Sequence, residues 1–179
     1  MALKMMCPRC WRKRRDPVIP GPCSYCQGEG EVPDEQLSPH FLLSEFLSSD
    51  RAIRFSIPND PDSIQRANIR RLVTEWLEPA RVLVGVPIEI TSGYRSARLN
   101  KAVGSRSPTS AHRFGWAADM KPSCSFPTWR DALVSVGIPF EEVLLEWGWV
   151  HAALFDAKGR QKREVLRLDP AGGPSTLWR

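Results

Sequence analysis

Histidine is scarce in this chain, with three residues among 179, and long apolar runs are missing. Charged residues such as Glu146 and Lys158 break the apolar stretches well short of the roughly 18 positions that a membrane-spanning helix needs. The opening residues, MALKMMCPRC, reach cysteines and the basic run WRKRR before any apolar stretch typical of a secretion signal. These absences argue against membrane insertion, and we expect synthesis and folding in a cytosol without a signal peptide.

The remaining composition is that of a globular protein. Hydrophobic residues make up 42% of the chain, which is normal for a protein with a real core. A length of 179 residues allows one domain of ordinary size and a small appendage. The net charge of +5 allows attraction to an anionic partner, either nucleic acid or an acidic polymer such as a bacterial wall.

Four of the five cysteines form two Cys-x-x-Cys pairs near the N-terminus, in CPRC and CSYC. In a reducing compartment such cysteines bind metal more often than they form disulfides. Two pairs close a four-sulfur zinc site with no open position, so the site is predicted to be structural. The ligands of this zinc ribbon, residues 1–33, are Cys7, Cys10, Cys23 and Cys26.

Two interpretations of the ribbon stay open. It folds a short segment around zinc, or it also docks on a partner or on nucleic acid through the basic run Arg12–Arg15. The fifth cysteine, Cys124, is expected to be a small packed side chain and not a ligand.

Helix and strand patterns alternate irregularly in the main domain, which we place at residues 36–166. Apolar residues at three- and four-residue steps predict an amphipathic helix over 62–84, capped by Asp62 or Ser63, and a second helix over 127–137. Residues 37–61 predict a short strand or turn, a helical stretch and a loop. Strands are expected at VPIEITS, WAADM and GWVHAALF. This mixture favours an α+β domain, with flanking helices around a small antiparallel sheet.

Two of the three histidines could share one site with an aspartate on the expected strands. Residues seven apart on a strand face opposite sides, so His112 and Asp119 share a site only if Gly115 turns the chain between them. His151 on a second strand offers a third ligand. Two imidazoles and a carboxylate form an open zinc site of the kind that performs hydrolysis. The alternative is that each histidine is a hydrogen-bonded core residue.

A family resemblance bears on these alternatives. The ordered motifs SGYRS, SAHRFGWAAD and WVH resemble those of the zinc D-Ala-D-Ala carboxypeptidase family of metallopeptidases, especially its bacteriophage branch, from about Phe41 to Leu166. The resemblance implies the D-Ala-D-Ala carboxypeptidase/hedgehog-like peptidase fold. It also implies that His112, Asp119 and His151 bind a catalytic zinc, which gives one catalytic and one structural zinc in all.

Four further residues receive roles beside the metal. The resemblance makes Arg95 the cation near the substrate carboxylate or the developing oxyanion, a role that suits its planar fork of donors. The alternative for Arg95 is a surface salt bridge of little energetic weight. Tyr94 and Ser110 are candidates for hydrogen bonds to substrate, with a turn or packing role as the alternative. Glu146 is the nearest acid to His151 and the candidate general base, provided that a bulge at Gly148 turns it toward the metal.

The resemblance further implies a substrate, the stem or cross-bridge peptides of peptidoglycan. Without a signal peptide, the enzyme would reach the cell wall after phage-induced release or as part of a virion. A rival interpretation is a structural or binding component of a virion, in the tail or baseplate, anchored to other virion proteins by the ribbon and the basic C-terminal tail, residues 167–179. Nucleic-acid binding through the ribbon is a third, less favoured option, and no membrane insertion is expected.

Overall fold

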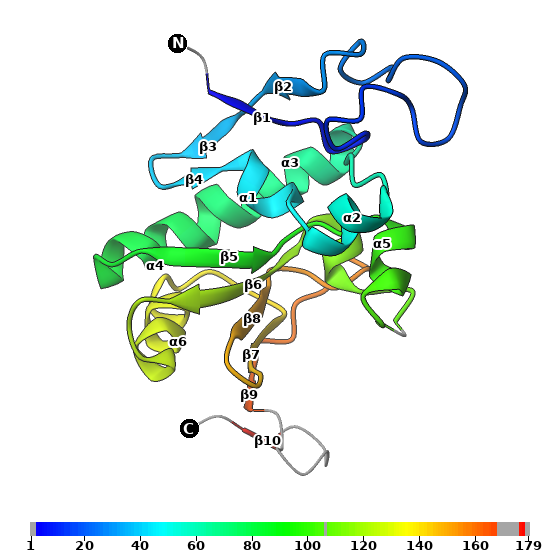
Figure 1. Ribbon diagram of the computed structural model, residues 1–179. Coiled ribbons are helices and arrows are strands. Elements are labelled where there is room, and N and C mark those ends of the chain that lie inside the picture. The colour runs from blue at the N-terminus through cyan, green and yellow to red at the C-terminus, as the bar shows by residue number, and fades with distance from the viewer. Residues whose placement is uncertain (1–2, 106, 168–175, 178–179) are drawn as a thin grey trace.

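A six-stranded sheet forms the centre of the protein in a computed structural model that describes residues 3–105, 107–167 and 176–177. Its strand order is β10-β9-β7-β8-β6-β5 (Figure 1). The strands are β5 (Ile88–Ser92), β6 (Ala117–Pro122), β7 (Glu142–Leu145), β8 (Val150–Ala153), β9 (Glu164–Arg167) and β10 (Thr176–Leu177). The expected strands in VPIEITS, WAADM and GWVHAALF are present as β5, β6 and β8.

The sheet is mixed, and this corrects the expectation of an antiparallel sheet. Strands β7 and β9 pair in parallel, with Glu142 opposite Glu164, while the other neighbours in the sheet are antiparallel. After β8 the chain is back at the end where β7 begins, and residues 154–163 carry it past that end to the free side of β7. The next strand therefore runs in the same direction as β7. A mixed α+β architecture is nevertheless what the sequence predicts.

The amphipathic pattern over 62–84 forms a continuous helical stretch. Asp62 caps it by accepting a hydrogen bond from the Gln65 amide at 2.7 Å. The stretch comprises α3 (Ser63–Arg71), a π-helical segment (Leu72–Leu77) and α4 (Glu78–Val84). The π turn, which the sequence pattern does not reveal, ends two residues before Pro79, whose ring nitrogen cannot donate to the carbonyl one turn back.

The core lies between this helical stretch, α6 (Phe126–Ser135) and the sheet. Trp76 is fully buried, stacks on Phe140 with ring centroids 5.2 Å apart, and donates its indole N–H to the Leu133 carbonyl at 2.8 Å. On β6, Ala118 and Met120 enter this core. The alternation predicted for WAADM therefore directs the intervening Asp119 to the other face of the sheet. Cys124 is half-buried against the same core, as expected.

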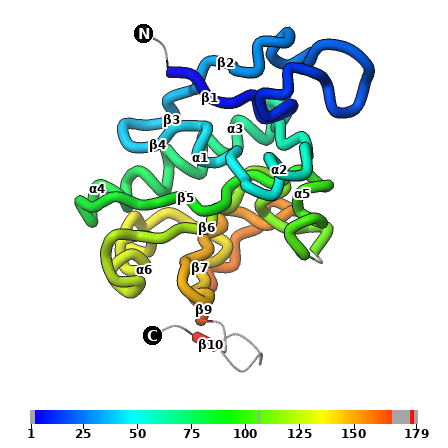
Figure 2. The backbone as a smooth tube through the Cα atoms, in the orientation of Figure 1, coloured from blue at the N-terminus to red at the C-terminus, as the bar shows by residue number. Residues whose placement is uncertain are grey.

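The remaining elements are short, and Figure 2 follows the chain through them. Residues 37–61 contain the expected strand, helical stretch and loop. The elements are β1 (Lys4–Met6), β2 (Glu31–Pro33), β3 (Gln36–Ser38), β4 (Phe41–Leu42), α1 (Leu43–Leu47), α2 (Asp50–Phe55), α5 (Ala97–Ala102) and a 3-10 helix (Ala111–Phe114).

The N-terminal segment packs directly on the rest of the protein. Trp11 is buried in a small cluster with Ala52, Ile57 and Leu99, and its indole N–H donates to the Ile57 carbonyl at 2.7 Å. Arg9 also forms an ion pair with Asp60 at 3.1 Å. The ribbon is therefore attached by both apolar and polar contacts, although its treatment as a domain separate from residues 36–166 stays a prediction.

The C-terminal tail that we set at 167–179 lies largely outside the described residues. Its described parts, Arg167 and β10, belong to the edge of the sheet, where β10 pairs with β9. Within the described ranges, no helix combines the length and the apolar character needed to cross a membrane.

Gly115 provides the first test of the fold. Its φ of +75° is in the left-handed region, and a Cβ at this position would lie 2.6 Å from the Gln65 carbonyl oxygen. We expect Gly115→Ala to lower the free energy of unfolding in urea by about 3 kcal/mol. Gly159→Ala is the matched control, because Gly159 has a φ of +72° but open space around it. It should cost only about 1 kcal/mol, and equal losses would contradict the close packing at Gly115.

Candidate active site

Three side chains from two strands and a 3-10 helix converge on one point. The Nε2 atom of His112 lies 3.2 Å from Asp119 Oδ1 and 3.2 Å from His151 Nδ1, and those last two atoms are 2.8 Å apart. Asp119 and His151 face each other directly across the β6–β8 ladder. The structure therefore brings together the three predicted zinc ligands.

His112 reaches this point because the chain turns at Gly115, as the sequence predicts. The 3-10 helix presents the imidazole, and its Nδ1–H donates to the Gly93 carbonyl at 2.7 Å. That hydrogen bond leaves Nε2 without a proton and directed at Asp119. Burial lowers the pKa of His112, which favours the neutral ring that binds a metal.

The donor set fits zinc. A tetrahedral zinc with bonds of about 2.0–2.1 Å to nitrogen and oxygen separates its ligand atoms by about 3.3 Å. The three separations here, 2.8–3.2 Å, are close to that value. Burial alone would raise the pKa of Asp119, but the facing His112 and His151 hold it well below its usual value, so the carboxylate is ionised as a ligand must be.

Arg95 forms an ion pair with the second carboxylate oxygen of Asp119. Its guanidinium pairs with Asp119 Oδ2, and its Nε–H donates to the Ser92 hydroxyl at 2.8 Å. The backbone N–H of Arg95 also donates to the His112 carbonyl at 3.1 Å. Arg95 is thus fixed beside the three converging atoms while Asp119 Oδ1 stays directed at the histidines.

These residues line an open cleft of about 460 Å³. Ser110, Trp149 and Glu146 also line it, so two more of the predicted site residues lie at the cleft. Tyr94 does not. Its side chain is buried in the main core, and this position favours the packing alternative over a hydrogen bond to substrate.

Glu146 reaches the cleft by a route that differs from the expected bulge. Residues 146–149 form the turn of a β7–β8 hairpin, closed by a hydrogen bond of 3.0 Å from the Glu146 N–H to the Trp149 carbonyl. Glu142, Leu144 and Glu146 line the cleft because every second residue along β7 points to the same face. Burial, followed by the charge of Asp119, raises the pKa of Glu146.

Glu142 is a site residue that the sequence reasoning missed. Its Oε1 lies 3.8 Å from Nε2 of His151, the ring nitrogen that faces away from Asp119. Metal-binding histidines commonly present their second nitrogen to a carboxylate, which orients the ring. The sequence signal for Glu142 was the alternation of side chains along EVLLE, which places it on the same face as Glu146. That face can be assigned to the cleft only once β7 is known to pair with β8.

Asn59 is a second missed residue, and it fixes the backbone on both sides of Arg95. Its amide nitrogen donates to the Tyr94 carbonyl at 2.9 Å, and its Oδ1 accepts from the Ser96 N–H at 2.7 Å. The Asn59 backbone N–H in turn donates to the Pro8 carbonyl, at 2.8 Å, within the first cysteine pair. The fully buried Asn59 therefore connects the ribbon to the Arg95 loop.

The four cysteines of the ribbon form the second candidate metal site. Their sulfur atoms all lie within 4.8 Å of one another, with Cys7 and Cys23 at 3.8 Å and Cys10 and Cys26 at 3.7 Å. Zinc bonded to four sulfurs at about 2.3 Å places those sulfurs about 3.8 Å apart. Disulfides need sulfurs about 2.05 Å apart. The spacing therefore fits a closed metal site.

An α+β fold with two histidines, an aspartate and a neighbouring acid at an open cleft is typical of metal-dependent hydrolases. Comparison with known families makes the assignment specific. The family model described as Peptidase M15 matches residues 39–151, and the chain belongs to this family of D-Ala-D-Ala carboxypeptidase-like zinc peptidases. The expected family resemblance is confirmed. No curated protein matches the chain.

The matched range begins after the cysteine ribbon and ends at His151. It includes the three converging residues and Arg95, so the family assignment bears on the cleft and not on the ribbon. Peptidases of this family are zinc-dependent metallopeptidases that act on peptidoglycan peptides.

Zinc content tests both metal sites. We expect the purified wild type to contain about two zinc ions per chain by mass spectrometry of the metals, one at each donor set. His112→Ala and Cys23→Ser should each lower the content to about one, because each removes a ligand from a different site. Retention of two ions by either variant would contradict the corresponding ligand set.

The contribution of the Asn59 side chain to stability is tested by the free energy of unfolding. Asn59→Ala removes two donated hydrogen bonds and one accepted hydrogen bond of a buried side chain, so we expect a loss of about 3 kcal/mol in unfolding free energy. Asn68→Ala is the control, because Asn68 is half-buried and donates one side-chain bond, to Phe114 at 2.8 Å. It should cost about 1 kcal/mol. Equal losses of unfolding free energy in the two variants would contradict the proposed contribution of the three Asn59 side-chain hydrogen bonds.

Proposed function

We propose that the protein is a zinc-dependent peptidase that hydrolyses peptide bonds of bacterial peptidoglycan, as a D-Ala-type carboxypeptidase or an endopeptidase. The observation that carries the proposal is the convergence of His112, Asp119 and His151 in a cleft that also contains Arg95 and Glu146. Membership of the M15 family supports the reaction class. The net charge of +5 suits an anionic wall.

The proposed metal ligands are His112 Nε2, Asp119 Oδ1 and His151 Nδ1. Bound zinc would make hydroxide available near neutral pH and polarise the scissile carbonyl. The Gly93 carbonyl orients the His112 imidazole through a hydrogen bond of 2.7 Å, and Glu142 lies 3.8 Å from the second nitrogen of His151, where its charge attracts the ring. The Cys7, Cys10, Cys23 and Cys26 set is proposed to hold a structural zinc.

Glu146 is the proposed general base. Its carboxylate lines the cleft together with the three proposed ligands. It would take a proton from the attacking water and then pass that proton to the nitrogen of the leaving amine. A pKa raised by burial and by Asp119 suits this exchange, because a base works best when its pKa lies nearer the working pH.

Arg95 is proposed to bind the substrate carboxylate or the developing oxyanion. Ser92 and Asp119 each take one of its N–H groups and hold the guanidinium in place. The remaining donors at the cleft are preorganised for a negatively charged oxygen. The Ser110 hydroxyl at the same cleft is proposed to hydrogen-bond substrate.

The proposed setting is bacteriophage lysis or a virion, as the resemblance to the phage branch of the family implies. Peptidoglycan sacculi provide the test. The zinc-loaded wild type should release soluble peptide fragments, which mass spectrometry would identify together with the bond cut, and His112→Ala should release none. Absence of fragments from a wild type that carries both zinc ions would refute the peptidase and favour a structural role in a virion.

Glu146→Gln tests the catalytic assignment. The variant should keep its zinc content and lose about 10²- to 10⁴-fold in the rate of fragment release, because the amide cannot accept the proton. Glu89→Gln is the control, since Glu89 is an exposed acid on β5 that does not line the cleft. Near-normal turnover of Glu146→Gln would remove the assignment.

A further inference from the structure

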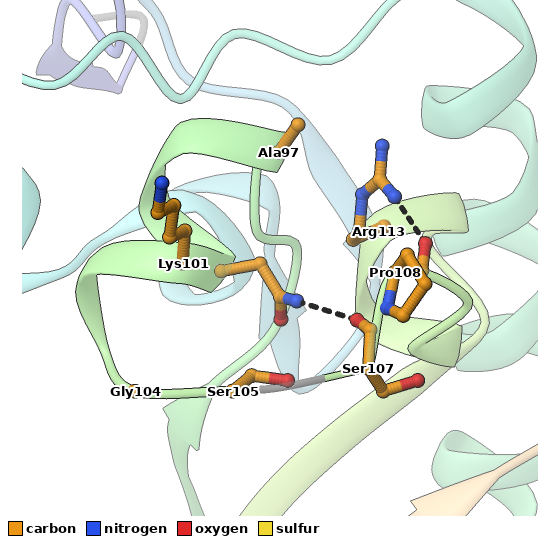
Figure 3. A pocket seen from close by; sticks show the side chains of 8 residues that line it. Ala97, Lys101, Gly104, Ser105, Ser107, Pro108 and Arg113 are labelled. Atoms are coloured by element: carbon orange, nitrogen blue, oxygen red, sulfur yellow. Dashed lines mark hydrogen bonds between the residues drawn. The ribbon is translucent and has the colours of Figure 1, made fainter.

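A second cavity lies beside the proposed catalytic cleft. It has a volume of about 560 Å³ and is formed by α5 and the chain that follows it (Figure 3). Gly104 and Ser105 line both this cavity and the cleft, so the two are neighbours across one short piece of backbone. None of the predicted site residues lines the second cavity, and the proposed reaction leaves it without a role.

The cavity and the cleft differ in charge. Lys101 and Arg113 are the charged residues among those described that line the cavity, and no described acid lines it. Neither cation forms an ion pair with a described acid. The cleft, by contrast, contains three acids, Asp119, Glu142 and Glu146. The cavity therefore favours an anionic group, whereas the cleft combines these acids with the cation Arg95.

Two residues that line the cavity also have buried polar atoms without partners. Asn100 is buried and donates its amide nitrogen to the Ser107 carbonyl at 3.0 Å, but its Oδ1 has no donor. Arg113 donates one terminal nitrogen to the Pro108 carbonyl, and its buried Nε–H has no acceptor. Buried polar groups without partners are rare in folded proteins, and both of these belong to residues in the wall of the cavity.

We propose that this cavity is a substrate subsite for a peptide residue that carries a free carboxylate. The inference rests on the proposed peptidase function. A peptide whose scissile bond lies in the cleft would cross Gly104 and Ser105 and place the carboxylate between Lys101 and Arg113. The subsite would make the enzyme selective for acidic peptides.

Binding of matched peptides tests this subsite. The probes are synthetic peptidoglycan stem peptides with amidated C-termini, either with free side carboxylates or with those carboxylates amidated. Titration calorimetry would use the full-length, zinc-loaded protein with Glu146→Gln, and mass spectrometry would verify that the peptides stay intact. We expect the free-carboxylate peptide to bind about tenfold more tightly than its amidated form. This preference should weaken as salt is added.

Variants of α5 locate the effect. Lys101→Gln should reduce the preference to near unity, and Lys101→Arg should restore most of it. Arg98→Gln is the matched control, because Arg98 is an exposed cation on the same helix that does not line the cavity, and it should leave the preference unchanged. Equal binding of the two peptides, or equal effects of Lys101→Gln and Arg98→Gln, would overturn the subsite.

The two proposals fail in different ways. If the wild type releases fragments from sacculi but does not distinguish the peptides, the subsite is refuted and the peptidase stands. If sacculi stay intact while the carboxylate preference and its dependence on Lys101 are observed, the peptidase is refuted and the cavity remains an acidic-peptide site.

Discussion

The register between β6 and β8 is the constraint on which the proposed active site depends. It sets Asp119 directly opposite His151, while Met120 pairs with Val150 and both enter the core on the other face. A slip of one residue would send the carboxylate into the core and expose apolar side chains, so burial of the core enforces the position of the proposed ligands. The geometry of the candidate metal site is in this sense a by-product of hydrophobic packing. Only His112 arrives from outside the sheet, and the tight turn at Gly115 brings it there.

Much of this arrangement could be predicted from local sequence. Alternation in WAADM indicates which face Asp119 occupies, the amphipathic pattern predicts the helical stretch capped by Asp62, and cysteine spacing predicts the sulfur cluster. Features that depend on pairing between distant segments could not be predicted in the same way. The parallel β9, the route that brings Glu146 to the cleft along β7, and the burial of Tyr94 all follow from which strand or helix lies beside which. A single sequence read in short windows contains no signal for those neighbours.

The cleft balances its charges within a small volume. Asp119 uses one oxygen toward the two histidines and the other toward Arg95. A buried carboxylate with no such partners would be costly, and each partner offsets part of that cost. Any change at Arg95 therefore also removes the partner of Asp119 Oδ2, so its kinetic effects would combine the proposed role toward substrate with the loss of a contact to a proposed metal ligand. Among the residues that the structure describes, Lys101 and Arg113 of the neighbouring cavity have no acidic partner that balances their charge in this way.

The link through Asn59 has a consequence for engineering a smaller enzyme. The match to the family model starts at residue 39, which suggests a minimal catalytic fragment that begins there. Such a fragment would uncover the apolar cluster around Trp11 and remove the Pro8 carbonyl that holds the backbone of Asn59. The loop that carries Arg95 would then lose its outer support although every residue of the cleft was still present. A grafting or domain-shuffling design should accordingly treat the ribbon as part of the catalytic unit.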